Sequence, residues 1–407
     1  MNVVFVNYGL FNSNSGGHVA HFANALSDLG ANVTVLGTND PETVNDFGPP
    51  CFEAIRMPEV GEEIPAEILA LAGRPDTVIH AWTPRRRVYE LVDAMVQETG
   101  CPYIVHLEDH EHLLLDSVME WSWDSLAKLG VDELDGLIPH HLSHPVRSPR
   151  FIRNSAGATL IVEKLGELCP DDLPKHVLEP GVDTDQFNAD LTAAQIAAIR
   201  EELFIDDGAK IIVYNGNMHS ANHHEVFSLY TAVMILRRRG HNIVLVRTGK
   251  DHYDKVDVSY SYLRGDWTID LGVVDRDRMI ETLKIADVFV QPGASEGFNA
   301  YRLPSKLPEF LALGRPLLLP ATNIGLRLRD GVEAILLKRG DAEEIADRVA
   351  EVIFSEDAGR SIGEAGRQFA TENLNWRANA SHLLNFYRSR LDGSSATLGT
   401  PKYLRTK

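Results

Sequence analysis

The chain has 407 residues, of which 44% are hydrophobic and 24% are charged, and its formal net charge is −19 at pH 7. This length exceeds what one hydrophobic core usually supports, so we expect two domains of an ordinary globular protein. The acidic balance argues against general nucleic-acid binding, which needs a basic face, but it leaves room for a local basic pocket that binds phosphate.

The three cysteines, Cys51, Cys101 and Cys169, lie far apart, and none belongs to a C-x-x-C pair. This spacing indicates neither a disulfide framework nor a thiolate zinc site. The chain begins with a strand-like run instead of a basic leader, and no run reaches the ~18 apolar residues of a membrane span. We therefore expect a cytoplasmic protein without a transmembrane segment. Peripheral membrane contact is compatible with this composition, and the oligomeric state is not indicated.

In the first half of the chain, short apolar runs alternate with an amphipathic pattern. Strands are predicted at residues 2–8, 32–37, 76–82 and 102–109. A helix is predicted over residues 13–30, with Val19, Phe22 and Leu26 at helical spacing and Gly30 as its stop. Strands that alternate with helices predict right-handed crossovers and a parallel sheet.

This alternation breaks between residues 111 and 150, where Trp121 and Trp123 precede a segment rich in proline and histidine. Such tryptophans could stack on a sugar or reach a membrane interface. We favour the more common role, which is to close a small satellite core. Residues 158–169 restore the alternation, and residues 177–187 have the composition of a linker.

The second half repeats the pattern. Strands are predicted at residues 210–216, 242–249, 269–274, 287–293 and 316–320, and helices at 224–240, 275–286, 341–354, 358–374 and 375–391. Asp275 is the expected N-cap of its helix. The expected fold class is therefore α/β, with two Rossmann-like domains at residues 1–182 and 183–374. A final helix, 375–391, and a loose polar tail, 392–407, complete the predicted division.

Two adjacent glycines, Gly16 and Gly17, lie between the first predicted strand and helix. Glycines let backbone N–H groups approach a ligand, and a helix N-terminus favours an anion, so one interpretation is a phosphate-binding loop. The other is a turn that needs positive φ. Because the pattern is not G-x-G-x-x-G and no Walker lysine follows, the residues alone leave both interpretations open.

The segment SEGFNAYRLPSKLPEFLALGRP, residues 295–316, mixes acids and bases at a predicted helix start. It follows a predicted strand, and open parallel sheets bind ligands at the carboxyl ends of their strands. Arg302 and Lys306 flank the expected start of the helix at Pro304 or Ser305. Two bases at this place suit a diphosphate.

Two acids complete this segment. Glu309 lies three residues after Lys306 on the same helical face, where a carboxylate can accept hydrogen bonds from ribose hydroxyls. Glu296 lies in the preceding loop, near the expected position of a sugar attached to the phosphates. The alternative is an ordinary surface Lys–Glu pair on a helix that ends at Gly314.

Taken together, these motifs resemble those of GT-B glycosyltransferases, close to family 4 of the retaining enzymes. The run GGHVAHFANALSDLGANVTVLG resembles the first loop and helix of that family, and LEPGVDTDQF is similar to its PNGVD…F segment. IADVFVQPGASEGF resembles ADVFVLPSxxEGF, and PSKLPEFLALGRPLLLP resembles PxKLxEYLAxGKPVV. The last two motifs are specific and correctly ordered, and the resemblance covers nearly the whole chain.

The resemblance implies two Rossmann-like domains that face each other across a cleft. The C-terminal domain would hold a nucleoside diphosphate sugar and the N-terminal domain an acceptor. Transfer would retain the anomeric configuration without a metal or a cofactor, because protein groups neutralise the departing diphosphate. The expected donor-binding residues are Gly16, Gly17, Asn217, Arg302, Lys306 and Glu309. The catalytic candidates are Glu108, His110 and Glu296, and the acceptor-side candidates are His18, His106 and Asp109.

The chain departs from the family pattern at three places. Asn217 stands where relatives carry an arginine, and residues 222–224 stand near their usual lysine, so we expect Arg302 and Lys306 to supply the missing charge. Glu296 and Glu309 lie further apart than usual, which implies an insertion in the loop. Glu108 stands where relatives carry a histidine, and the neighbouring Asp109 could instead be a helix N-cap.

The clustered histidines do not predict a metal site. His110 and His112 have i,i+2 spacing, which on a helix points two ligands to different faces, and no third ligand is fixed by the sequence. Contacts with an acceptor and plain exposure to solvent are the two interpretations that stay open.

The expected function is that of a retaining glycosyltransferase acting on an unidentified glycan, lipid-linked or small-molecule acceptor. Two alternatives stay open. One is a degenerate GT-B protein that binds nucleotide sugar or a partner enzyme without catalysis, and the other is a GT-B nucleotide-sugar epimerase. A nicotinamide-dependent dehydrogenase is poorly supported, since no G-x-G-x-x-G follows a strand.

Overall fold

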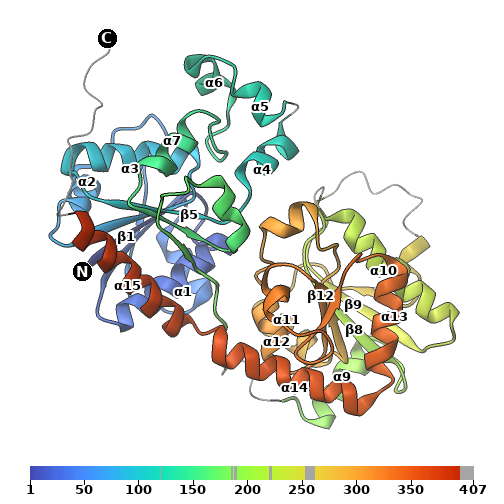
Figure 1. Cartoon of the computed structure of the whole chain (residues 1–407). Coiled ribbons are helices and arrows are strands. Elements are labelled where there is room, and N and C mark those ends of the chain that lie inside the picture. Colours follow the sequence, from blue (N-terminus) through green and yellow to red (C-terminus); the bar gives the residue numbers. More distant parts are fainter. Residues whose placement is uncertain (120, 185–186, 188–189, 220–221, 253–261, 395–407) are drawn as a thin grey trace. The chain divides into compact units, whose positions relative to one another are not determined.

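The computed structural model describes residues 1–119, 121–184, 187, 190–219, 222–252 and 262–394. The chain divides into two compact units, Met1–Pro180 with Trp376–Lys407, and Gly181–Asn375 (Figure 1). The predicted tail at 392–407 lies outside the described residues except for the end of the last helix, which runs to Ser394.

The first unit is built on a seven-stranded sheet in which every pairing is parallel. Its strands are β1 (Asn2–Asn7), β2 (Asn32–Gly37), β3 (Glu53–Arg56), β4 (Thr77–Trp82), β5 (Tyr103–Leu107), β6 (Gly157–Leu160) and β7 (Lys175–Val177), in the order β3-β2-β1-β4-β5-β6-β7. The central strands β1, β4 and β5 are buried except at Asn2, as their near-continuous apolar sequences predict.

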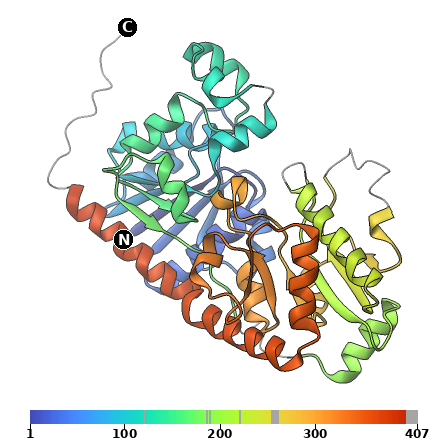
Figure 2. The same ribbon diagram turned by 45° about the vertical axis from the view of Figure 1, so that its right-hand side comes forward.

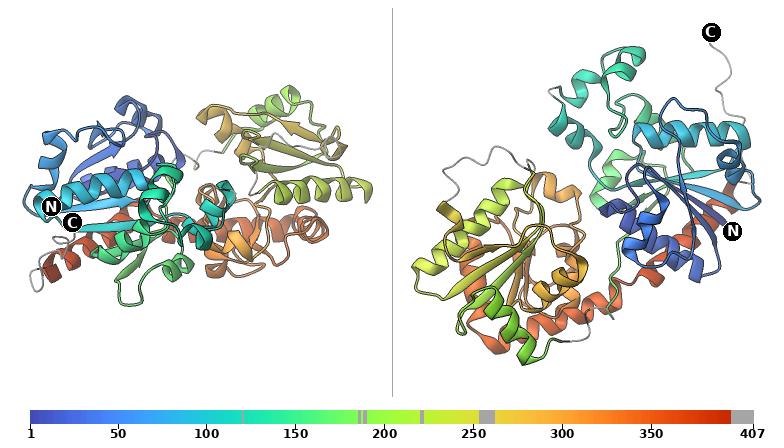
Figure 3. Two further views of the ribbon diagram at one scale, coloured as in Figure 1. Left: turned by 90° about the horizontal axis from the view of Figure 1, so that it is seen from above. Right: turned by 180° about the vertical axis from the view of Figure 1, so that it is seen from behind.

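Helices cover both faces of this sheet, as two further directions of view show (Figure 3). They are α1 (Asn14–Asp28), α2 (Ala66–Ala72), α3 (Arg86–Thr99), α7 (Arg147–Asn154) and α15 (Trp376–Ser394), with the 3₁₀ helices η1 (Pro41–Phe47) and η2 (Glu163–Leu168). Helix α15 packs beside α1 and closes the core, where Leu383 and Tyr387 are buried. The predicted stop of α1 is confirmed, since Gly30 has a φ of 87° just after the helix.

Between β5 and β6 the chain forms a group of three short helices, α4 (Glu111–Val118), α5 (Trp123–Leu126) and α6 (Val131–Leu137). They stand off from the sheet and have a small core of their own (Figure 2). Trp123 is buried in this core and stacks on His112, whereas Trp121 is 54% exposed. The satellite-core prediction is therefore correct for Trp123 and wrong for Trp121.

The second unit holds a six-stranded parallel sheet in the order β10-β9-β8-β11-β12-β13. Its strands are β8 (Lys210–Asn215), β9 (Ile243–Thr248), β10 (Thr268–Asp270), β11 (Val288–Val290), β12 (Leu317–Pro320) and β13 (Ile335–Leu337). Its helices are α9 (Ala193–Glu202), α10 (His223–Arg238), α11 (Arg276–Lys284), α12 (Leu307–Ala312), α13 (Ala342–Ile353) and α14 (Glu356–Asn373), with 3₁₀ helices η4 (Gly297–Tyr301) and η5 (Asn323–Arg327). The expected α/β class with two Rossmann-like sheets is thus confirmed.

Two local predictions for the second unit can be checked directly. Asp275 caps α11, since its side chain accepts a hydrogen bond from the Arg278 N–H. Helix α12, however, begins at Leu307 instead of Pro304 or Ser305 and has only six residues. A turn at residues 305 and 306 separates Pro304 from the helix, and Pro308 lies in the first helical turn. With so short a helix, side chains must provide most of the charge at this edge.

Candidate functional site

In the first unit, polar side chains gather at the carboxyl ends of the neighbouring strands β1, β4 and β5. The Glu108 carboxylate, which follows β5, accepts a hydrogen bond from the Ser15 hydroxyl at 2.5 Å and lies 3.3 Å from Nδ1 of His18. Both partners are buried residues in the first turns of α1. The Tyr8 hydroxyl lies 3.1 Å from that of Ser15 and extends the cluster.

The predicted residues Glu108 and His18 are therefore brought together by the fold. Burial raises the pKa of Glu108, but the His18 contact and the hydrogen bond from Ser15 outweigh it and lower this pKa to about 2. Glu108 is ionised at neutral pH. A fixed carboxylate at this sheet edge can orient a hydroxyl or stabilise positive charge that develops on a nearby group.

Asp109 faces another partner. Its carboxylate forms a 2.9 Å ion pair with Arg85, a buried residue that also binds Glu111 and lies over the Tyr8 ring. The alternative reading of Asp109 as an N-cap is wrong, because His110 caps α4 by accepting from the Leu113 N–H. Burial outweighs the attraction of Arg85 and raises the pKa of Asp109 to about 6.

The remaining histidine candidates differ in position. His106 is fully buried, stacks on Trp82 and is hydrogen-bonded to the Thr159 hydroxyl, so it lies behind the cluster as part of the core. Burial lowers its pKa to about 3, which keeps it neutral. The ring of His110 is used in capping α4, and its pKa is also lowered by burial. The positions of His106 and His110 do not test their predicted acceptor-side and catalytic roles, which stay predictions.

The two glycines lie inside α1 and not in a turn. Neither has positive φ, so that interpretation is wrong. Their backbone N–H groups bond to the N-cap Ser13, through its Oγ for Gly16 and its carbonyl for Gly17. A Cβ on Gly16 would lie 2.1 Å from the Phe11 carbonyl oxygen, and one on Gly17 would lie 2.8 Å from the Phe47 ring. Close packing therefore favours glycine at both positions, and their predicted contact with the donor stays a prediction.

In the second unit, Arg302 follows η4 and forms a 2.8 Å ion pair with Glu225, in the first turn of α10. Its Nε donates to Asn299 Oδ1 at 2.8 Å, and Asn299 donates in turn to Glu225. The guanidinium is thus held in place and its charge is balanced before any ligand arrives. Glu225 was not identified from the sequence, and an acid in a helix's first turn is too common to have indicated it.

Lys306 lies beside the loop that follows β8. Its Nζ is 4.4 Å from the centre of the Tyr214 ring, and a Cβ added to Gly216 would lie 2.3 Å from that nitrogen. Burial, followed by the nearby charges of Arg302 and Arg247, lowers the pKa of Lys306 to about 7. The two predicted bases therefore share one site, but neither is a simple exposed cation.

Of the two predicted acids, Glu309 is largely buried and Glu296 is exposed. The Glu309 carboxylate forms a 2.7 Å ion pair with Arg276 at the start of α11, whereas burial raises its pKa. A ribose that bound Glu309 would compete with Arg276. Glu296 directly precedes η4.

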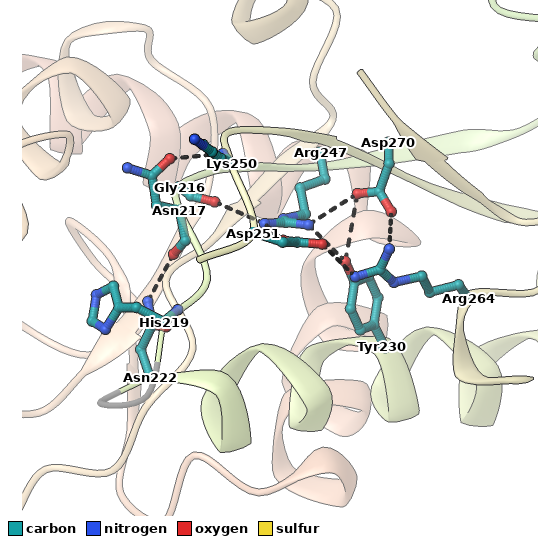
Figure 4. A network of polar contacts seen from close by, with 10 residues as sticks. All are labelled: Gly216, Asn217, His219, Asn222, Tyr230, Arg247, Lys250, Asp251, Arg264 and Asp270. Carbon is teal, nitrogen blue, oxygen red and sulfur yellow. Dashed lines mark hydrogen bonds and ion pairs between the residues drawn. The ribbon is translucent and has the colours of Figure 1, made fainter. Parts of the chain in front are cut away.

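Behind the loop after β8 lies a network of four charges (Figure 4). The buried Arg247 and the half-buried Arg264 each pair with Asp251 and with Asp270. Arg247 also donates to the Gly216 carbonyl at 3.4 Å, which ties the network to the loop. These residues were missed. Asp251 lies only four positions after Arg247, but Asp270 comes beside Arg247 through the parallel pairing of β9 and β10, which no local pattern indicates.

Asn217, at the position of the family's arginine, and Asn222, near that of its lysine, bind their own loop. Asn217 Oδ1 accepts from the Lys250 N–H at 2.7 Å, and Asn222 donates to the Asn217 carbonyl while accepting from the His219 N–H (Figure 4). They therefore hold the backbone of the loop in place. The part of the chain that the structure describes contains no group of three His, Cys, Asp or Glu side chains suited to a metal ion.

Comparisons with known proteins identify the class. The fold matches HepE of Anabaena, solved with UDP-glucose, with a TM-score of 0.70, 13% identity and coverage of 96% of this chain and 100% of that one. It also matches a glycosyltransferase from Rickettsia africae, with a TM-score of 0.67, 14% identity and coverage of 96% and 98%. The fold is therefore the GT-B fold of glycosyltransferases, and the resemblance drawn from the motifs is confirmed.

Sequence comparison adds matches to part of the chain. Residues 209–354 match the model of the family described as glycosyl transferases group 1. A curated relative, the GDP-mannose-dependent alpha-(1-6)-phosphatidylinositol monomannoside mannosyltransferase of Mycobacterium tuberculosis, is 26% identical over 218 residues. That match covers 52% of this chain and 55% of the relative, so the chain spans about half the length of the curated relatives it matches. None of the described helices combines the length and hydropathy that crossing a membrane requires.

Proposed function

We propose that the protein transfers a sugar from a nucleoside diphosphate sugar to an acceptor hydroxyl, with retention of the anomeric configuration. The observation that carries this proposal is the closeness of Arg302 and Lys306 beside the loop after β8, just before the helix that holds Glu309, within the residues that match glycosyl transferases group 1. A sugar nucleotide is bound by basic groups that pair with its phosphates and by a carboxylate that accepts hydrogen bonds from its hydroxyls.

In the proposed reaction, Arg302 and Lys306 bind the diphosphate, and Glu309 accepts hydrogen bonds from the ribose once Arg276 has moved aside. The bond between the anomeric carbon and the diphosphate oxygen breaks, and its electron pair leaves with the diphosphate. The acceptor oxygen bonds to the anomeric carbon on the same face and loses its proton to the departing phosphate. Fixed positive charge stabilises that leaving group, so no cofactor is part of the proposal.

The first unit would bind the acceptor, with Glu108 and His18 as the proposed contacts. Their position at the carboxyl ends of central parallel strands supports this assignment, because open α/β sheets bind ligands there. We propose no acceptor beyond a hydroxyl compound. The relatives favour GDP- and UDP-linked sugars as the first donors to try.

A donor screen tests the proposal. Each common GDP- and UDP-sugar is incubated with the protein, and release of the free nucleoside diphosphate is measured with water or a mixture of simple glycosides as acceptor. NMR of the product reports whether the anomeric configuration is retained. The Lys306→Met variant is the matched control, and equal release by both proteins would contradict the assignment.

One observation favours a second candidate, a GT-B protein that binds a nucleotide sugar without transferring it. Asn217 and Asn222 serve the loop, and the charge of Arg302 is already balanced by Glu225. Such a protein would be stabilised by a nucleoside diphosphate in thermal unfolding yet release none from any donor. Interconversion of the free sugar nucleotide would indicate the epimerase instead.

A further inference from the structure

One side chain of the second unit, Lys306, holds its amine among other charged groups. The side chain is half-buried, and it lies against the Tyr214 ring and the backbone of Gly216. Within the described ranges, its amine has neither a hydrogen-bond acceptor nor a carboxylate at ion-pair distance. A half-buried amine without an acceptor is an uncommon arrangement, since a buried charge normally has a partner.

The other charged groups of this site are already paired with one another. Arg302 is bound to Glu225, and the Arg247 guanidinium is bound to Asp251 and Asp270. Among the residues that the structure describes, no carboxylate of this site is left over for Lys306, although Glu225 is close enough to exert a weak attraction.

The groups that face Lys306 come from five places. Tyr214 comes from β8, Arg247 from β9, Glu225 from α10, Arg302 from the end of η4 and His219 from the loop after β8. Of these, two are permanent cations and one is a carboxylate that already binds a cation. Two cations beside one paired carboxylate therefore disfavour the protonated form of Lys306, and so does the burial of its side chain.

Resting on the proposed function, we propose that Lys306 takes up a proton when the diphosphate of the donor binds and gives it back when the diphosphate leaves. A bound phosphate oxygen would accept a hydrogen bond from the ammonium and supply the negative charge that the site lacks. Occupancy of the donor site is then coupled to the protonation of one side chain.

The sign of the coupling follows from linkage. Because the phosphate binds the protonated amine, affinity is full at low pH and is lost as pH rises through the pKa of the empty site, which is about 7. If the complex stays protonated, the affinity should fall about fifteenfold between pH 7 and pH 8.5, and binding at pH 8 should take up about 0.9 proton. Above pH 7.5 the second ionisation of the diphosphate is complete and adds nothing.

Isothermal titration calorimetry measures both quantities. GDP and UDP are titrated into the full chain at pH 7, 8 and 8.5, in HEPES and in Tris, whose ionisation enthalpies differ, so the difference in heat gives the number of protons taken up. Lys306→Arg keeps a permanent charge and should show neither proton uptake nor the loss of affinity. Lys338→Met, which removes an exposed lysine elsewhere in the same unit, should behave as the wild type does.

Each outcome of the calorimetry either supports or overturns the proposed proton uptake by Lys306. Binding without proton uptake overturns this inference and leaves the proposed function standing. Uptake that persists in Lys306→Arg assigns the proton to another group, such as His219, whose pKa the charge of Lys306 influences, and also overturns it. Failure of every nucleoside diphosphate to bind overturns the donor assignment itself. If Lys306→Arg does not fold, as judged by thermal unfolding, Lys306→Met is used, and it should bind more weakly than the wild type at pH 7 and without uptake.

Discussion

Replacement of Gly16 by alanine separates two roles for the glycine pair. In the structure Gly16 is helical, and a Cβ there would lie 2.1 Å from the Phe11 carbonyl oxygen and 2.4 Å from that of Leu10. Both neighbours are backbone atoms, so a Cβ at Gly16 fits only if the loop before α1 moves. We expect Gly16→Ala to cost about 3 kcal/mol, at the upper end of ordinary overpacking, although alanine is otherwise the better helix former.

The matched control is Gly136→Ala in α6. A Cβ at Gly136 meets no atom within 4 Å, so that change should stabilise the same unit by roughly 0.5–1 kcal/mol. In thermal unfolding, a shift of about 2–4 °C per kcal/mol predicts that Gly16→Ala melts roughly 6–12 °C below the wild type. Nucleoside diphosphate affinity, measured well below that midpoint, should be unchanged if the glycine serves packing alone.

Two results would refute this reasoning. If Gly16→Ala melts no lower than Gly136→Ala, the close approach to Phe11 is not a constraint. If Gly16→Ala keeps its stability but loses ligand affinity, the glycine contacts the donor, as the motif first indicated.

Other perturbations test the two candidate sites. Glu309→Gln should weaken nucleoside diphosphate binding by ~1.5–3 kcal/mol while the fold survives, and unchanged affinity in calorimetry would remove Glu309 from the ribose site. Glu108→Gln should lower turnover about 10²-fold and leave the donor Kd nearly intact, and full turnover would exclude Glu108 from the reaction. Because the pKa of Glu108 is lowered to about 2 from 4.5, its contribution to stability should be present above about pH 4.5 and be lost as pH falls toward 2. Acid titration of the Glu108→Gln variant should lack that part of the decline, and an identical decline in both proteins would contradict it.

Most of the strands and helices could be predicted from the sequence, because hydrophobic periodicity and turn residues report local structure. The apolar runs around Val4, Ile79 and Val213 became central strands, and the stop at Gly30 and the cap at Asp275 have the expected geometry. Arg302 and Lys306 could be placed at one sheet edge because they lie close together along the chain. The late start of α12 at Leu307 was missed, although Pro308 lies in its first turn, where proline is favoured.

The partners of the site residues could not be read in the same way. Glu225 lies 77 positions before Arg302, and Glu108 lies 93 positions after Ser15. Such pairs depend on which strands are neighbours and on which helix face meets them, and an acid or a serine at these places has no local signature. The same limit applies to Arg247, whose strand reads as apolar apart from this one buried charge.

The last helix of the chain completes the first unit, and this has a consequence for synthesis on the ribosome. Trp376 meets Phe22 edge-on at 5.0 Å, and the Tyr387 hydroxyl bonds His80 at 2.7 Å, so α15 covers part of the core that residues 1–180 begin. At ~5–20 residues per second, the roughly 200 intervening residues take about 10–40 s to translate. During that interval the apolar face awaiting α15 stays open to water and to chaperones, while the second unit, which is continuous in sequence, can finish folding first.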